Sequence, residues 1–151
     1  MEGDDMDSLH YLLMKSHACF SRQVVSRAQR ELGLSPGQPK VLDSLMDHEG
    51  CDQKTLAAHC EIEQATLGSI LSRMEEKRLI RRHRQPGNRR SLFVYLTPEG
   101  REAAQAMQEI FRQEEEAVAR KLTSEQKEAL RALLQQFCQG LVPEEQEVDR
   151  V

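Results

Sequence analysis

Five arginines gather around one tight turn in the middle of this chain. The stretch from Ile80 to Thr97, IRRHRQPGNRRSLFVYLT, carries them on both sides of Pro86-Gly87-Asn88, at positions Arg81, Arg82, Arg84, Arg89 and Arg90. Proline followed by glycine is typical of a turn, and the runs on either side have strand character. Arginine side chains bind phosphate and can enter the minor groove of a DNA duplex. The stretch therefore predicts a β-hairpin whose basic tip can bind nucleic acid.

An amphipathic helix is expected directly before this hairpin, over Gln64 to Arg78. Leu67, Ile70, Leu71 and Met74 recur at helical spacing and define its apolar face. An α-helix fits the major groove, where polar side chains can hydrogen-bond to base edges. The other face carries the residues that could contact bases or phosphate: Gln64, Ala65, Thr66, Ser69 and Arg73. The alternative for these residues is an ordinary solvated helix face.

A shorter helix should precede this one, opening at Asp52 and closing near Cys60. Two short helices joined by about four residues form the helix-turn-helix pattern. The amides at the start of the first helix could hold a phosphate, or its opening residues could serve only as a cap. The residues concerned are Gln53, Lys54 and Thr55.

Charge is distributed unevenly along the chain. Between Arg73 and Arg90 there are eight basic and two acidic residues, a net charge of +6. The whole chain has a formal net charge of −4, so the remaining residues together carry −10. One basic surface on an acidic body is consistent with DNA binding through that surface. An acidic protein partner would meet the same surface equally well.

The rest of the chain predicts long helices. At 151 residues, with 38% hydrophobic and 30% charged residues and no Trp, it suits one mainly helical domain or a domain with an appended interface. A helix is expected over residues 7–32, ending at Gly33. The next should begin at Ser35, with Ser35 as the cap, Pro36 in the first helical position and Gln38 completing a capping box.

Two further helices should follow the hairpin. The first is capped by Thr97-Pro98 and runs to about Leu122, and the second starts at a capping box over residues 123–126. The last helix has a broad apolar stripe formed by Leu130, Leu133, Leu134, Phe137 and Leu141. One small lobe cannot cover that stripe and the one on the first helix, so the end helices predict a partner surface.

The cysteines and histidines give no pattern typical of a metal site. Cys19, Cys51, Cys60 and Cys138 contain no C-x-x-C pair, and His48-x-x-Cys51 and His59-Cys60 match no standard zinc spacing. The acidic N-terminus does not resemble a secretory signal, which predicts a cytoplasmic protein with reduced thiols. We find no catalytic motif and expect neither an enzyme nor a cofactor.

The order of these elements resembles the MarR family of bacterial winged helix-turn-helix regulators, over about residues 8–141. The resemblance rests on residues 34–38, on the helix-turn-helix, and most specifically on Asn88-Arg89-Arg90 followed by Leu96-Thr97-Pro98-Glu99-Gly100. It implies that Arg90 enters the minor groove. The family's wing usually has an aspartate where this chain has Asn88, and a helix-ending glycine is common where this chain has Arg78. Gly68 and Ser69 replace frequent hydroxyl and basic residues.

The fold class expected is therefore mainly α with a small β-hairpin wing. A winged helix-turn-helix lobe over 34–97 would join a helical dimerisation platform over 1–33 and 98–142, with an acidic flexible tail over 143–151. The resemblance implies a homodimer that binds a pseudo-palindromic operator in double-stranded DNA, and a repressor released by a small-molecule effector. The alternatives are a protein-interaction module that does not bind DNA and a regulator that senses oxidants through a thiol.

Overall fold

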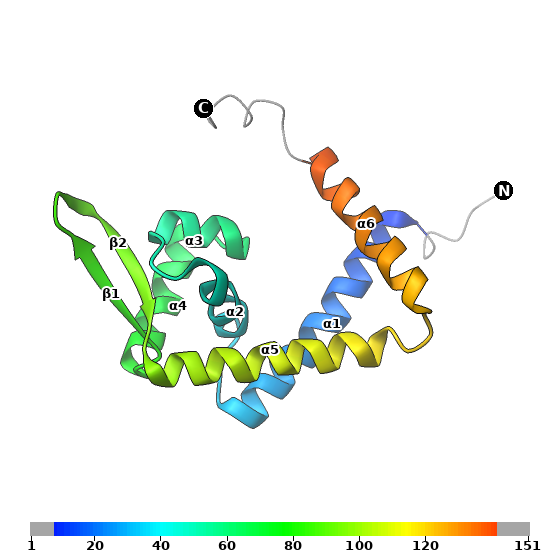
Figure 1. The fold of residues 1–151 in the computed structure, drawn as a ribbon, viewed down its shortest axis with the longest axis horizontal. Helices are drawn as coiled ribbons and strands as arrows, with labels where there is room; N and C mark the ends of the chain where they lie inside the picture. Colours follow the sequence, from blue (N-terminus) through cyan, green and yellow to red (C-terminus); the bar gives the residue numbers. More distant parts are fainter. Residues whose placement is uncertain (1–7, 142–151) are drawn as a thin grey trace. The chain divides into compact units, whose positions relative to one another are not determined.

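The computed structural model describes residues 8–141 (Figure 1). The predicted acidic tail at 143–151 lies outside these residues. Eight elements follow one another along the described chain: α1 (Leu9–Leu32), α2 (Gln38–His48), α3 (Gln53–Cys60), α4 (Gln64–Glu76), β1 (Ile80–Gln85), β2 (Asn88–Leu96), α5 (Pro98–Val118) and α6 (Ser124–Leu141). This is the predicted fold class, helical with one small hairpin. Packing divides the chain into two compact units, with the boundary between Glu114 and Glu115.

The first unit contains the hydrophobic core. Apolar side chains of α2, α3 and α4 are buried together, including Leu42, Leu56 and Leu71, and Val94 of the hairpin joins them. The core also takes in Val24 and Ala28 of α1 and Ala104, Met107 and Ile110 of α5. The helix-turn-helix therefore rests on the inner faces of α1 and the first part of α5. The division into a DNA-binding lobe and a dimerisation platform, with boundaries near residues 33 and 98, stays a prediction.

The hairpin is a two-stranded antiparallel sheet. Ile80 pairs with Leu96, Arg82 with Val94, and Gln85 with Asn88, with an irregularity in register between His83 and Gln85. The turn is thus Pro86-Gly87, and Asn88 begins β2 instead of belonging to the turn. The backbone of Cys51 extends the sheet at its base, because its carbonyl oxygen accepts a hydrogen bond from Val94 N at 3.0 Å. This contact anchors the hairpin to the segment before α3.

Several predicted helix ends are confirmed, whereas α4 ends at Glu76 instead of Arg78 and α5 ends at Val118 instead of about Leu122. Gly33 ends α1 in the left-handed conformation with φ of 66°, and Thr97 Oγ1 caps α5 by accepting from Gly100 N at 2.9 Å. At α6, the Thr123 hydroxyl accepts from Gln126 N while the Gln126 side chain accepts from Thr123 N, which is the full capping box.

The start of α2 differs from the prediction. The helix begins at Gln38, with Gly37 as its N-cap and Pro39 in its first turn, so Ser35 and Pro36 belong to a preceding turn. Gln38 still accepts a hydrogen bond from Ser35 N at 3.0 Å. Gly37 has φ of 88°, a non-helical conformation that glycine adopts readily. The helix therefore starts later in the chain than predicted, at Gln38.

The backbone is strained two residues beyond the end of α4, at Arg78. Arg78 has φ of 60°, in the left-handed region where a side chain costs about 1–2 kcal/mol. The conformation is held from both sides, because Arg78 N donates to Glu75 O at 3.0 Å and its carbonyl oxygen accepts from the Thr97 hydroxyl at 2.5 Å. The glycine that the family resemblance leads one to expect here would adopt this turn without strain.

The second unit holds α6, whose side chains are exposed. None of its described residues is buried, and Leu133 and Leu141 keep 62% and 68% of their surface in solvent. At the other end of the described chain, Leu9 and Met14 of α1 are also exposed. None of the helices between residues 8 and 141 combines the length and apolar composition needed to cross a membrane.

Candidate nucleic-acid interface

Helix α4 has one buried and one exposed face, as its sequence predicts. Leu67, Leu71 and Met74 are fully buried against the core. The candidates for DNA contact point away from it and are exposed: Gln64, Ala65, Thr66, Ser69 and Arg73. Ser69 donates its hydroxyl proton to the carbonyl oxygen of Ala65 at 3.4 Å, so its oxygen remains able to accept. A continuous accessible polar face is what a helix in a DNA groove requires.

The start of α3 is held by a side-chain cap. Asp52 accepts a hydrogen bond from Thr55 N at 2.7 Å. This bond is the main reason why the pKa of Asp52 lies below its ordinary value. The residue that caps α3 is therefore Asp52, and Thr55 takes part through its backbone amide. Lys54 and Thr55 are exposed, so phosphate contact through their side chains stays a prediction.

The third residue of that segment, Gln53, is already engaged. Its side-chain oxygen accepts a hydrogen bond from Arg82 of the hairpin at 3.3 Å. Gln53 is also only half-exposed. Direct contact between Gln53 and DNA likewise stays a prediction. The side-chain amide that would make this contact already binds Arg82.

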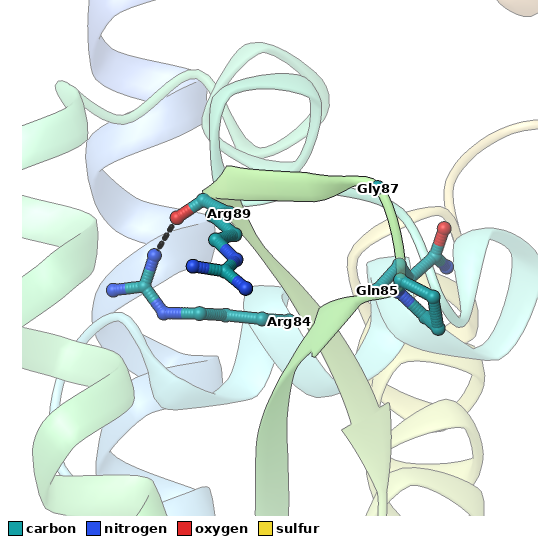
Figure 2. Close-up of a pocket in the computed structure, with 5 residues that line it drawn as sticks. Arg84, Gln85, Gly87 and Arg89 are labelled. Atoms are coloured by element: carbon teal, nitrogen blue, oxygen red, sulfur yellow. Dashed lines mark hydrogen bonds between the residues drawn. The ribbon is translucent and has the colours of Figure 1, made fainter.

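The tip of the hairpin is organised by hydrogen bonds to its own backbone. Gly87 has φ of 84°, and the Asn88 side chain accepts from the amides of Arg90 and Ser91 at 3.3 and 3.2 Å. In Figure 2 the Arg84 guanidinium reaches across to donate to the carbonyl oxygen of Arg89. Asn88 thus orders the backbone around Arg90.

Arg84 and Arg89 extend to one side of the tip while Gln85 extends to the other (Figure 2). The hairpin residues from His83 to Arg90 are exposed. Within residues 8–141, neither Arg89 nor Arg90 forms an ion pair through its guanidinium. Two cations without acidic neighbours at a projecting tip favour binding of a polyanion.

Two basic residues of this region serve the fold instead. Lys77 Nζ donates to the carbonyl oxygen of Gly33 at 3.0 Å and so caps the end of α1. Arg82 forms an ion pair with Glu75, and its side chain is only 17% exposed. A count of charges along the sequence cannot separate these residues from Arg89 and Arg90, because their partners lie seven to 44 positions away.

Two of the thiols, Cys51 and Cys60, lie in the lobe, one partly buried and the other buried. Burial raises the pKa of both Cys51 and Cys60, which disfavours the reactive thiolate form. Cys19 accepts a hydrogen bond from Arg22 at 3.2 Å.

The rings of His48 and His59 stack in parallel with their centroids 3.8 Å apart. Among residues 8–141, neither histidine belongs to a group of three or more potential metal ligands.

Comparisons with known proteins agree with this geometry. A model of the MarR family matches residues 32–91, which span α2 to the start of β2. The transcriptional regulator HosA of Escherichia coli O111:H- is 32% identical over 117 residues, covering 77% of this chain and 87% of that protein. The HTH-type transcriptional repressor Rv2887 of Mycobacterium tuberculosis is 27% identical over 129 residues, covering 85% of this chain and 92% of that protein.

Solved structures share the fold. The Staphylococcus aureus MepR–DNA complex superposes with a TM-score of 0.79 at 22% identity, over 89% of this chain and 98% of that one. Mycobacterium tuberculosis Rv2887, solved with salicylic acid, has a TM-score of 0.70 at 26% identity, over 88% and 98%. The likeness to HosA extends over three quarters of the chain, well beyond the helix-turn-helix, and with the family match it shows that this protein belongs to the MarR family.

Proposed function

We propose that this protein is a sequence-specific DNA-binding transcriptional regulator, a homodimeric repressor in the cytoplasm that a small molecule releases from its operator. The observation that carries the proposal is the pairing of two surfaces within the first unit. The exposed polar face of α4 and the arginine-bearing tip of the hairpin belong to adjacent elements. Such a pair can occupy a major groove and the neighbouring minor groove.

Exposed apolar surface on this chain supports a dimer. On α6, Leu130, Leu134 and Phe137 are each at least 40% exposed, and they share one stripe with Leu133 and Leu141. Soluble proteins rarely leave a stripe of that kind in water, so a second copy is the natural cover. Two lobes related by a two-fold axis would bind half-sites about 34–36 Å apart.

Release by an effector would then work through the spacing of the two lobes. Rv2887, a relative, was solved with salicylic acid, which supports a small organic molecule as the effector class. A molecule that binds better to a dimer with the wrong lobe spacing lowers DNA affinity by its difference in binding to the two states. Identical binding to both states would leave repression unchanged.

The proposal is tested by footprinting on the DNA that flanks the protein's own gene. We expect a protected, pseudo-palindromic site, with affinity that falls steeply as salt rises because counterions are released from phosphates. A winged-helix module for acidic proteins would protect no defined site. A basic surface that binds all duplexes equally would also defeat the proposal, because it would show salt dependence without sequence preference.

The first prediction concerns the wing. Replacing Arg90 with alanine should weaken operator binding by about 1–3 kcal/mol, since an exposed guanidinium at the tip would lose its place in the minor groove. Gel-shift titration measures the affinity, and light scattering confirms that the dimer persists. Arg120→Ala, which removes the same charge beyond the end of α5, is the matched control. Equal affinity of Arg90→Ala and the control would show that Arg90 does not touch DNA.

The second prediction separates two roles on α4. Gln64→Ala or Thr66→Ala should change which operator variants are preferred, at about 1–3 kcal/mol for each lost base contact. Arg73→Ala should weaken binding to all sequences alike, as loss of a phosphate contact does. Selection of sites from a random duplex library distinguishes these outcomes. Recovery of the wild-type site by both Gln64→Ala and Thr66→Ala would mean that α4 reads no bases.

A further inference from the structure

We propose that Arg82 is the residue that fixes the hairpin against the recognition helix, and that Gln53 and Ser72 affect DNA binding through it without touching DNA. This inference rests on the proposed DNA-binding function. It divides the arginines of the hairpin into two classes. Those at the tip meet the duplex, whereas Arg82 at the base sets where the tip lies.

The guanidinium of Arg82 joins three elements. Its Nη1 donates to the Gln53 side-chain oxygen at the start of α3, at 3.3 Å. Its Nη2 donates to the Ser72 hydroxyl of α4 at 3.2 Å. Nε lies 3.5 Å from Glu75 Oε2, also on α4. Every nitrogen of the guanidinium therefore has a protein partner on the helix-turn-helix.

The backbone of the same residue adds a fourth contact. Arg82 N donates to Glu75 Oε2 at 3.1 Å. This one carboxylate oxygen therefore accepts hydrogen bonds from both the backbone and the side chain of Arg82. In β1, Arg82 pairs with the fully buried Val94 of β2. The side chain is 17% exposed, in contrast to the exposed residues of the tip. Arg82 is thus built into the junction and presents little of its charge to solvent.

Arginine is suited to this role because its donors have a fixed planar arrangement. Three partners in different directions can be met at once by a guanidinium fork, whereas a lysine ammonium is a point charge on a flexible stem. Loss of the fork would leave only two links between the hairpin and α4: the connecting residues 77–79 and the hydrogen bond from Arg82 N to Glu75. The tip would then sample more positions relative to α4, and the two could no longer meet adjacent grooves at their full joint affinity.

The experiment compares Arg82→Lys with Arg82→Gln. The probe is the duplex that wild-type protein selects from a random library, and affinity is measured at several salt concentrations. A positioning role predicts that both variants bind roughly tenfold more weakly, about 1.4 kcal/mol. It also predicts that both keep the wild-type slope of log affinity against log salt, since no phosphate contact is lost.

A direct phosphate contact predicts the opposite pattern. Arg82→Lys would then bind like wild type, and Arg82→Gln would lower the salt slope by about 0.9. Either result overturns the proposal. Hydroxyl-radical footprinting supplies a second readout: protection of the minor groove by the wing should weaken in Arg82→Lys, while protection by α4 in the major groove persists. Retention of both at wild-type strength also counts against the proposal.

A double-mutant cycle keeps the test valid if Arg82→Gln folds poorly. Gln53→Ala and Ser72→Ala should each weaken binding in the wild-type background and have little further effect when combined with Arg82→Lys. Additive losses would mean that Gln53 and Ser72 contact DNA themselves. If wild-type protein selects no duplex at all, the proposed DNA-binding function fails, and that outcome is distinct from these.

Discussion

An alanine at position 100 should destabilise the first unit by about 3 kcal/mol or more, a large effect for the addition of one methyl group. A Cβ built on Gly100 would lie 1.8 Å from the carbonyl oxygen of Leu79 and 2.7 Å from its carbonyl carbon. Both atoms belong to backbone, and that backbone is held because Leu79 O accepts from Thr97 N at 3.1 Å. Movement of either segment would disturb this bond and the neighbouring cap, in which Thr97 Oγ1 accepts from Gly100 N. Urea unfolding followed by circular dichroism measures the change.

Gly68→Ala is the matched control for that substitution. Gly68 lies within α4, and a Cβ there meets nothing within 4 Å. Alanine should therefore stabilise the helix by about 0.5–1 kcal/mol through its better helical propensity. If Gly100→Ala were as stable as wild type, the close approach of α5 to Leu79 would not exist in solution.

Placing a charge on the stripe of α6 should convert the proposed dimer to a monomer. Phe137→Glu would put a carboxylate at the centre of a desolvated interface, where an unpaired charge costs several kcal/mol. Sedimentation equilibrium should then give the mass of one chain. Binding to the full operator should fall by at least a hundredfold, because each lobe must bind its half-site without the other.

The control for this charge is Gln139→Glu, which lies on the opposite face of the same helix. An added carboxylate there should leave the dimer mass unchanged, since it remains in water. Truncation before Thr123 gives an independent test of the same interface, and we expect monomer or aggregate. A soluble dimer from the truncated chain, or from Phe137→Glu, would mean that the copies associate through another surface.

Local signals in the sequence predicted the elements well. Helical spacing of apolar residues located α1, α4 and α6, and the Thr123 capping box gave the start of α6 because both of its hydrogen bonds form between close neighbours. The exposed face of α4 was predicted from the same periodicity. The family resemblance added the assignment of the wing and drew attention to Arg78, whose positive φ is now observed.

Contacts between distant residues could not be predicted in this way. The helix start at Gln38 depends on a glycine conformation that Pro36 and Ser35 do not reveal. Nothing in the local sequence separates Arg82, which is bound to α3 and α4, from the exposed Arg81 beside it. Both carry the same charge, and only the partners brought together by folding distinguish a brace from a solvated cation.

The tight contact at Leu79, Thr97 and Gly100 also links the position of the hairpin tip to the orientation of α5. The base of β1 is joined to the first turn of α5 by a backbone hydrogen bond and by close van der Waals contact, so the positions of the two are coupled. From that joint to the turn, the strand extends for about 20 Å. If the hairpin turned with α5 by roughly 10°, its tip would move through about 3.5 Å, more than the length of a hydrogen bond. If Arg90 enters the minor groove as proposed, a displacement of that size would withdraw it.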